Sequence, residues 1–475
     1  MLRLGVVAAA ALALFLVPPA GGGGPLRTAL NENGELDLPP GEAAIALRRM
    51  RAAGVTTLRT SLGWASVTPS QRPPGFDATN PFDPAYNWAY YDAKFNRLLA
   101  AGLEPLVVLI GGPRWDPGSA RSEIPDAAEF GRFARAAAER YSGRHPGLPR
   151  IRLWQIWNEP NVNVYFRPQF RDGRPYAPQA YRRILNAAAA AIHSVRRDNV
   201  VVGGGFSPFT VTRGDTVTIG PLRFMRELLC MSAGRRPRPT CRQRAEFDVW
   251  SHHPYTSGGP THQAFHRDDV SLGDLPEMRA LLRAAVRARH VVARRGVRFW
   301  VTEFSWDTKP PDKYGLPVRL QARWTSEALY RMWRLGINLV AWLMLRDSPY
   351  PSQPVQSGLY YNGGSSLELD RPKPTLTAFR FPFVALRERG RTVVWGRTPD
   401  SRPATVVVER KAGRGWRRVT ALRATRSGIF TARLAGPARG SLRARRAGSR
   451  DASLPFALAK VRDRFVYPFG CGVCP

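Results

Sequence analysis

The strongest constraint on the fold is a regular alternation of short apolar strands and amphipathic helices between residues 26 and 388. The expected strands cover 26–30, 55–60, 106–110, 151–157, 200–204, 247–252, 297–302 and 339–343. The expected helices cover 41–53, 86–101, 127–141, 178–196, 222–230, 275–294, 322–335 and 376–387. A (β/α)8 barrel requires this number of strand–helix units. We therefore predict an α/β fold, with a TIM barrel over residues 25–390.

The pattern of apolar and turn-forming residues changes after Gly390. Short strand-like runs broken by Gly, Pro, Asp and Ser follow, and no helical period is visible. Residues 391–475 are therefore predicted to form a small antiparallel, sandwich-like β-domain. Such a domain could buttress the barrel or bind carbohydrate.

The N-terminus has the pattern of a signal peptide. Arg3 precedes an apolar run over residues 4–17, and a Pro-Pro-Ala-Gly segment follows. The run is shorter than the roughly 20 residues that span a bilayer. We interpret residues 1–24 as a signal peptide, with an uncleaved anchor as the alternative, and expect a secreted or envelope-associated protein.

The formal charge of +35 comes almost entirely from arginine, because only six of the 71 basic residues are lysines. Arginine in place of lysine, together with abundant Ala, Gly and Pro, is typical of a GC-rich genome. The arginines are scattered and form no single stripe, so we expect no nucleic-acid partner. Electrostatic association with an acidic envelope or polysaccharide is the alternative. The oligomeric state is left open.

The four cysteines fall into two close pairs. In an exported protein an even number favours disulfides. Cys230 and Cys241 are predicted to close an Arg- and Pro-rich loop. The pairing of Cys471 with Cys474 stays open, since a redox or metal role is the alternative there.

Two glutamates carry the chemistry that the sequence suggests. Glu159 follows the strand ending Ile156-Trp157-Asn158, and Glu303 follows Trp300-Val301-Thr302. In such a barrel, functional side chains gather at the C-terminal ends of the strands. Two facing carboxylates can cleave a glycosidic bond, one as a proton donor and one as a nucleophile.

Other strand ends supply candidate partners of the two glutamates. Arg59 and Tyr255 are suited to hold a carboxylate by charge and hydrogen bonding. Alternation along the sixth strand turns His253 and Tyr255 into the cavity and His252 away from it. Trp64, Trp115 and Trp306 follow strand ends as candidate sugar platforms or as packing residues.

The motif Trp154-Gln155-Ile156-Trp157-Asn158-Glu159-Pro160-Asn161 resembles the retaining glycoside hydrolases of clan A, family 39 above all, with families 5 and 51 as near alternatives. The resemblance covers the barrel but not residues 391–475. It implies that Glu159 is the acid/base and Glu303 the nucleophile. It also implies that Asn158 binds the sugar 2-hydroxyl and that Trp342 forms the floor under the reacting sugar.

The resulting hypothesis is a secreted retaining glycosidase that cleaves β-type bonds, with transglycosylation as a close variant. The alternatives are a non-catalytic carbohydrate-binding protein on the same barrel and a cationic envelope protein. We expect no cofactor and no metal, because His145, His262 and His266 lack ligand spacing and Gly203-Gly204-Gly205 lacks the dinucleotide spacing.

Overall fold

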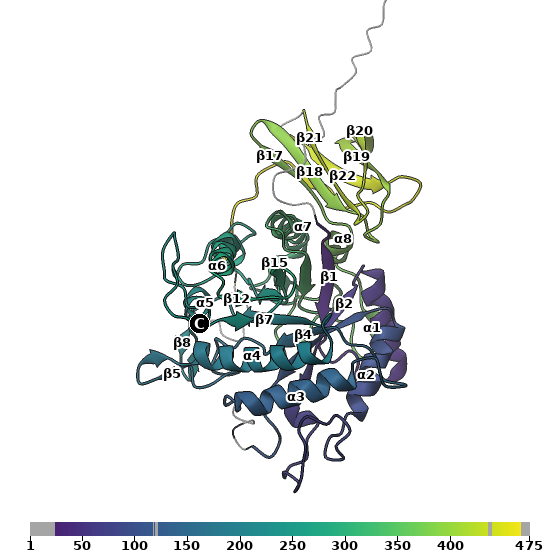
Figure 1. Ribbon diagram of the computed structural model, residues 1–475. Helices are drawn as coiled ribbons and strands as arrows, with labels where there is room; N and C mark the ends of the chain where they lie inside the picture. The colour runs from purple at the N-terminus through teal and green to yellow at the C-terminus, as the bar shows by residue number, and fades with distance from the viewer. Residues whose placement is uncertain (1–23, 117, 119–121, 436–438, 467–475) are drawn as a thin grey trace, which may run out of the picture.

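Parallel strands close into a barrel in the order β1-β16-β13-β11-β7-β4-β3-β2 (Figure 1). The computed structural model describes residues 24–116, 118, 122–435 and 439–466. The barrel strands are β1 Arg27–Asn31, β2 Thr57–Gly63, β3 Glu104–Ile110, β4 Leu153–Ile156, β7 Val200–Phe206, β11 Val249–His252, β13 Arg298–Val301 and β16 Leu339–Trp342. Pairing of β1 with both β2 and β16 closes the barrel, which confirms the predicted fold class.

A helix follows each barrel strand and packs on the outside of the sheet. These helices are α1 Pro40–Ala52, α2 Ala89–Ala100, α3 Ala127–Arg140, α4 Ala177–Val195, α5 Pro221–Leu229, α6 Leu275–Arg287, α7 Val318–Arg334 and α8 Pro374–Arg380. No helix among the described residues is long and apolar enough to cross a membrane. Two-residue strands pair within the loops: β5 Phe170–Arg171 with β6 Arg174–Pro175, β8 Thr212–Arg213 with β9 Thr216–Val217, β10 Ala245–Glu246 with β12 Val291–Val292, and β14 Thr308–Lys309 with β15 Leu316–Pro317.

Apolar side chains fill the inside of the barrel. The inner cluster consists of Ala29, Leu106, Leu153, Val200, Val202, Val249, Trp300, Leu339 and Ala341. Arg27 and Arg298 lie over the Trp300 ring. The barrel is therefore a packed core, and its C-terminal rim is left for function.

Two antiparallel sheets form the C-terminal β-domain (Figure 1). One contains β17 Phe383–Glu388, β18 Arg391–Arg397 and β21 Ile429–Leu434. The other contains β19 Thr405–Ala412, β20 Gly415–Arg423, β22 Ser441–Arg446 and β23 Phe456–Ala457. Trp395 of β18 packs against Tyr330 and Trp333 of α7, so the β-domain shares a core with the barrel.

Two predicted boundaries are wrong. The helix expected over 376–387 ends at Arg380, and Phe383 begins a strand paired with β18, so the predicted domain boundary at 391 falls inside the first hairpin of the β-domain. The helix expected over 275–294 ends at Arg287 because Val291 and Val292 form β12. Most of the predicted signal peptide (1–24), along with Cys471 and Cys474, lies outside the described residues.

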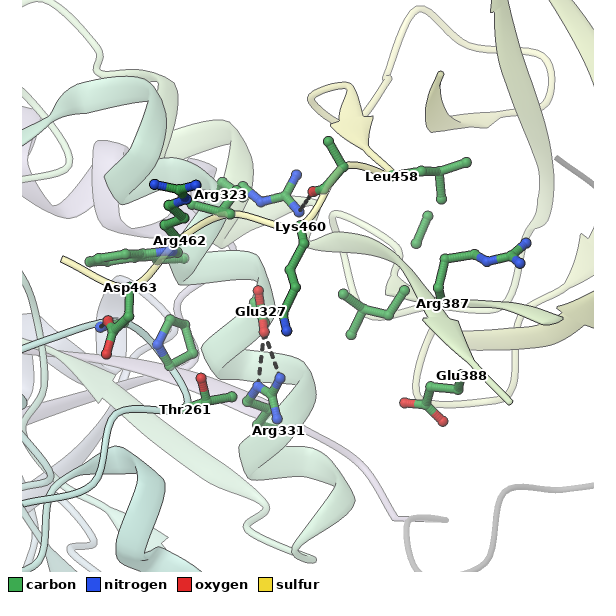
Figure 2. Close-up of a pocket in the computed structure, with 17 residues that line it drawn as sticks. Thr261, Arg323, Glu327, Arg331, Arg387, Glu388, Leu458, Lys460, Arg462 and Asp463 are labelled. Atoms are coloured by element: carbon green, nitrogen blue, oxygen red, sulfur yellow. Dashed lines mark hydrogen bonds and ion pairs between the residues drawn. The ribbon is translucent and has the colours of Figure 1, made fainter. Parts of the chain in front are cut away.

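The segment after β23, residues 458–466, returns to the barrel, and we call it the C-terminal strap. Arg323 of α7 donates to the carbonyl of Ala459 over 3.2 Å, where the strap leaves the β-domain. Asp463 accepts from the Gly259 amide and contacts His262 Nδ1, each over 2.6 Å. Figure 2 shows the cavity of about 510 Å³ that the strap encloses with α7 and β17.

The strap reaches the loop that follows β11. The amide of Val466 donates to the carbonyl of Ser257 over 3.0 Å, two residues beyond Tyr255. The end of the described chain is thus fastened to the C-terminal rim of the barrel.

Candidate active site

Glu159 and Glu303 meet at the C-terminal rim of the barrel, one after β4 and the other after β13. One side-chain ligand atom from each of Glu159, His253 and Glu303 lies within 4.8 Å of the other two. A carboxylate oxygen of Glu159 is therefore no more than 4.8 Å from one of Glu303. The side chains of Glu159 and Glu303 are 12% and 20% exposed, so solvent and substrate can reach both.

Both oxygens of Glu303 are held by predicted partners. Arg59 Nη1 lies 3.1 Å from Oε2, and the Tyr255 hydroxyl donates to Oε1 over 2.8 Å. Arg59 comes from β2 and Tyr255 from the loop after β11. Charge and two hydrogen bonds thus fix the orientation of the Glu303 carboxylate.

Arg59 is itself held by three amide side chains. Its guanidinium donates to Asn31 Oδ1 over 2.7 Å, to Gln155 Oε1 over 3.0 Å and to Asn158 Oδ1 over 2.7 Å. Asn158 was predicted from the motif, whereas Asn31 and Gln155 were not. Their signal was available in the sequence, since each is a polar residue at the end of, or within, an apolar barrel strand.

Burial raises the pKa of Glu159 to about 7, and the positive charge of Arg59 opposes that shift. His253 Nδ1 lies 2.9 Å from Glu159 Oε1, and His253 Nε2 lies 3.2 Å from the Thr302 hydroxyl. Burial lowers the pKa of His253 to about 3, so its ring is neutral at neutral pH. A neutral ring can donate from either nitrogen, so it can pair with Glu159 in either protonation state.

The backbone around Glu159 is unusual. Trp157 and Glu159 have φ angles of +68° and +45°, a region that side-chain-bearing residues rarely occupy. The Glu159 amide donates to the carbonyl of Gly205 over 2.9 Å. A Cβ at Gly205 would lie 2.7 Å from Gln155 Nε2, so a glycine is needed for β7 to approach the site. These constraints hold the Glu159 side chain over the barrel mouth.

The tryptophans predicted to contact sugars differ in how exposed their side chains are. Trp64 and Trp306 are buried to 1% and 3% exposure in the core, so their predicted role as sugar platforms is wrong. Trp342 is also only 1% exposed and packs against Phe304, which leaves almost no ring face for a sugar. Its predicted role as the floor of the site is therefore not supported.

Two other aromatic residues retain a possible contact with substrate. Trp115 is partly exposed and packs edge-on against Phe76, and its role as a platform stays a prediction. Burial raises the pKa of Tyr165 to about 12, and the charges of Glu159 and Glu303 add to that shift. Tyr165 is 40% exposed and is suited to line the leaving-group side.

The remaining predicted residues lie as follows. His252 points away from the cavity and contacts the carbonyl of Val270 through Nε2, as alternation along the strand predicted. Cys230 and Cys241 form a disulfide with a Cα–Cα distance of 5.2 Å, as predicted. Glu159, His253 and Glu303 could geometrically hold a metal ion, but the Arg59 guanidinium already supplies a cation beside Glu303.

The structure is similar to solved glycosidases. A family 39 glycoside hydrolase from the gut symbiont Bacteroides cellulosilyticus WH2 matches with a TM-score of 0.50 and 16% identity, over 86% of this chain and 81% of that chain. A glucosidase from Croceicoccus marinus matches with a TM-score of 0.49 and 13% identity, over 88% of this chain and 94% of that chain. No protein-family model and no curated protein matches the sequence.

At sequence identities of 13–16%, the similarity between these structures and this chain is one of fold. The resemblance to family 39 is confirmed at that level, since the match to the family 39 structure covers 86% of this chain and this chain forms a closed parallel barrel. The chain therefore shares a TIM-barrel fold with this family 39 glycoside hydrolase.

Proposed function

We propose that the protein is a secreted retaining glycoside hydrolase that cleaves β-type O-glycosidic bonds of an oligo- or polysaccharide. The observation that carries this proposal is a pair of carboxylates with an oxygen of one within 4.8 Å of an oxygen of the other, together with the burial that raises the pKa of Glu159 to about 7. Retaining enzymes place their carboxyl groups about 5–5.5 Å apart, whereas inverting enzymes need about 6.5–9.5 Å to admit a water molecule.

In the first step, Glu159 gives its proton to the glycosidic oxygen while a Glu303 oxygen attacks the anomeric carbon. The bond to the leaving group breaks, and a glycosyl ester forms on Glu303. Arg59 and Tyr255, which hold Glu303, keep the attacking oxygen in place. Burial of Glu159 supports the acid role, because it keeps the carboxyl protonated near neutral pH.

In the second step, Glu159 is a carboxylate and removes a proton from water, which attacks the ester and releases the sugar with its configuration retained. His253 contacts Glu159 throughout. As a neutral ring it can donate from Nδ1 to Glu159 Oε1 in both steps, which leaves the proton of the carboxylic acid on Oε2 for the glycosidic oxygen in the first step. Transglycosylation would follow the same route with a sugar hydroxyl in place of water.

Asn158 is proposed to bind the sugar 2-hydroxyl. Its oxygen accepts from Arg59, and its Nδ2 has no hydrogen-bond partner within the described part of the chain, which leaves that donor for substrate. Trp115 is proposed as a platform for a neighbouring sugar.

A mechanism-based label tests the proposal. A 2-deoxy-2-fluoro β-glycoside with a dinitrophenyl leaving group should modify Glu303, and peptide mass spectrometry should locate the label. A panel of sugars is used, since the sequence and structure leave the sugar open. Labelling of another residue would show that Glu303 is not the nucleophile, and no labelling by any sugar would favour the non-catalytic carbohydrate-binding alternative.

Azide rescue separates the two glutamates. Glu159→Ala should still form the glycosyl ester from a dinitrophenyl substrate and then stall for want of a base. Azide needs no base to attack, so it should restore turnover and yield the β-glycosyl azide. Glu303→Ala should show neither behaviour. Formation of the α-azide by Glu159→Ala would reverse the assignment.

A further inference from the structure

A groove of about 620 Å³ runs between α5, α6 and the loop of residues 230–241, away from the candidate active site. We call it the basic groove and the loop the arginine loop. Five arginines and one glutamate line it: Arg226, Arg235, Arg236, Arg267, Arg287 and Glu277. Its volume lies within the range of ligand pockets, about 300–1,000 Å³.

Four of the five arginines of this groove are available to a ligand. Arg226 pairs with Asp268 over 2.7 Å. Arg235, Arg236, Arg267 and Arg287 are exposed, and none of these four has an ion pair within the described part of the chain. Glu277 is the one acidic residue in the lining. The groove therefore carries an excess of positive charge that the protein itself does not neutralise.

The arginine loop is built to hold two of these cations in place. The Cys230–Cys241 disulfide closes its base. Inside the disulfide, Ser232 and Arg238 exchange hydrogen bonds of 2.8 and 3.0 Å, which leaves Arg235 and Arg236 at the tip. Side chains on a preorganised loop lose less freedom on binding, which favours affinity.

The shape of the groove indicates an extended anion. The lining follows α6 from Glu277 to Arg287, a helical rise of about 15 Å. Leu281 and Ala284 provide an apolar floor along this length. Cations spread over such a distance suit repeated carboxylates or sulfates, each of which a guanidinium binds with two hydrogen bonds.

We propose that the basic groove is a second carbohydrate site, which binds a chain of acidic sugars such as uronic acids. The proposal does not rest on the proposed catalysis. A single nucleic-acid strand is a poorer fit, because the lining contains no aromatic residue on which bases could stack. A membrane is also a poorer fit, since lipid surfaces favour protruding faces over a concave one.

The test measures binding to polygalacturonate, a polymer of uronic acids, at 150 mM NaCl by titration calorimetry. All proteins carry Glu303→Gln, so that the active site cannot consume the probe. The groove variant carries R235Q, R236Q, R267Q and R287Q. The matched control carries R417Q, R418Q, R423Q and R426Q, which are exposed arginines on the β-domain without ion pairs among the described residues.

The groove variant should bind polygalacturonate about tenfold more weakly or worse, as four exposed charge pairs would give. The control has the same net charge and should stay within about twofold of the parent. Glu277→Gln should bind more tightly, because it removes the opposing charge. Dextran, a neutral polymer, should bind all variants equally. With Glu303 restored, the groove variant should still take the fluoroglycoside label, so a failure here is distinct from a failure of the proposed catalysis.

Equal losses in the two quadruple variants would show that net charge alone drives binding and would overturn the proposal. The proposal would also be overturned if phosphatidylglycerol vesicles or a single-stranded oligonucleotide bound the parent more tightly than polygalacturonate does and lost that binding in the groove variant.

Discussion

The raised pKa of Glu159 predicts the pH dependence of the proposed reaction. A carboxyl at its usual value of 4.5 would be about 3% protonated at pH 6, whereas a pKa of about 7 gives about 90%. Burial therefore increases the amount of competent acid at pH 6 by about 30-fold. Because the acid form is needed, kcat/KM should be high below pH 7 and should fall tenfold per pH unit well above it.

The assay follows kcat/KM from pH 4 to 10 for aryl β-glycosides with poor and good leaving groups. Poor leaving groups should show the fall near pH 7, while dinitrophenyl glycosides, which need no proton, should not show it. Glu159→Gln should remove the fall and lower kcat/KM on poor leaving groups by about 10²–10⁴-fold. A fall that persists in Glu159→Gln, or one that lies near pH 4.5 in the parent, would refute the assignment of Glu159 as the acid.

Two further predictions concern residues around the two sites. Arg59→Met should lower kcat/KM about 10–100-fold, because Glu303 loses a charged hydrogen bond. Because Arg59 lowers the pKa of Glu159, the pH at which kcat/KM begins to fall should also rise in this variant. An unchanged pH profile would contradict this. Replacement of both Cys230 and Cys241 by Ser should lower the free energy of unfolding, measured in urea, by at most about 3 kcal/mol and should weaken polygalacturonate binding. A thiol titration that finds both cysteines free in the parent protein would contradict the disulfide.

Most of the barrel could be predicted because each strand is a short apolar run buried on both faces and each helix buries one regular face. The error at residues 376–387 came from a short apolar run, Phe383-Val384-Ala385-Leu386, that fits a helix or a strand equally well. Pairing with β18 across the turn at Arg389-Gly390 decides in favour of the strand, and the periodicity of the run itself does not reveal that pairing.

The charged residues of the candidate site could be predicted from the sequence, whereas the residues and backbone geometry that hold them in place could be predicted less well. Glu159, Glu303, Arg59 and Tyr255 stand at strand ends, where the barrel fold brings them together. The positive φ angle of Glu159 depends on tertiary contacts that a linear pattern does not contain. The same holds for the tryptophans, since burial of Trp342 is decided by neighbours from other strands and helices.

The C-terminal strap has a consequence for how the protein can be made and cut. Asp463 is bonded to His262 and Gly259, residues about two hundred positions earlier, in the loop that carries Tyr255. During synthesis this loop cannot form these hydrogen bonds until the strap has left the ribosome. A recombinant fragment that stops at the last barrel helix lacks these bonds, and a protease that nicks the strap removes them from the finished protein. The β-domain and its tail therefore belong in any expressed version whose activity is to be measured.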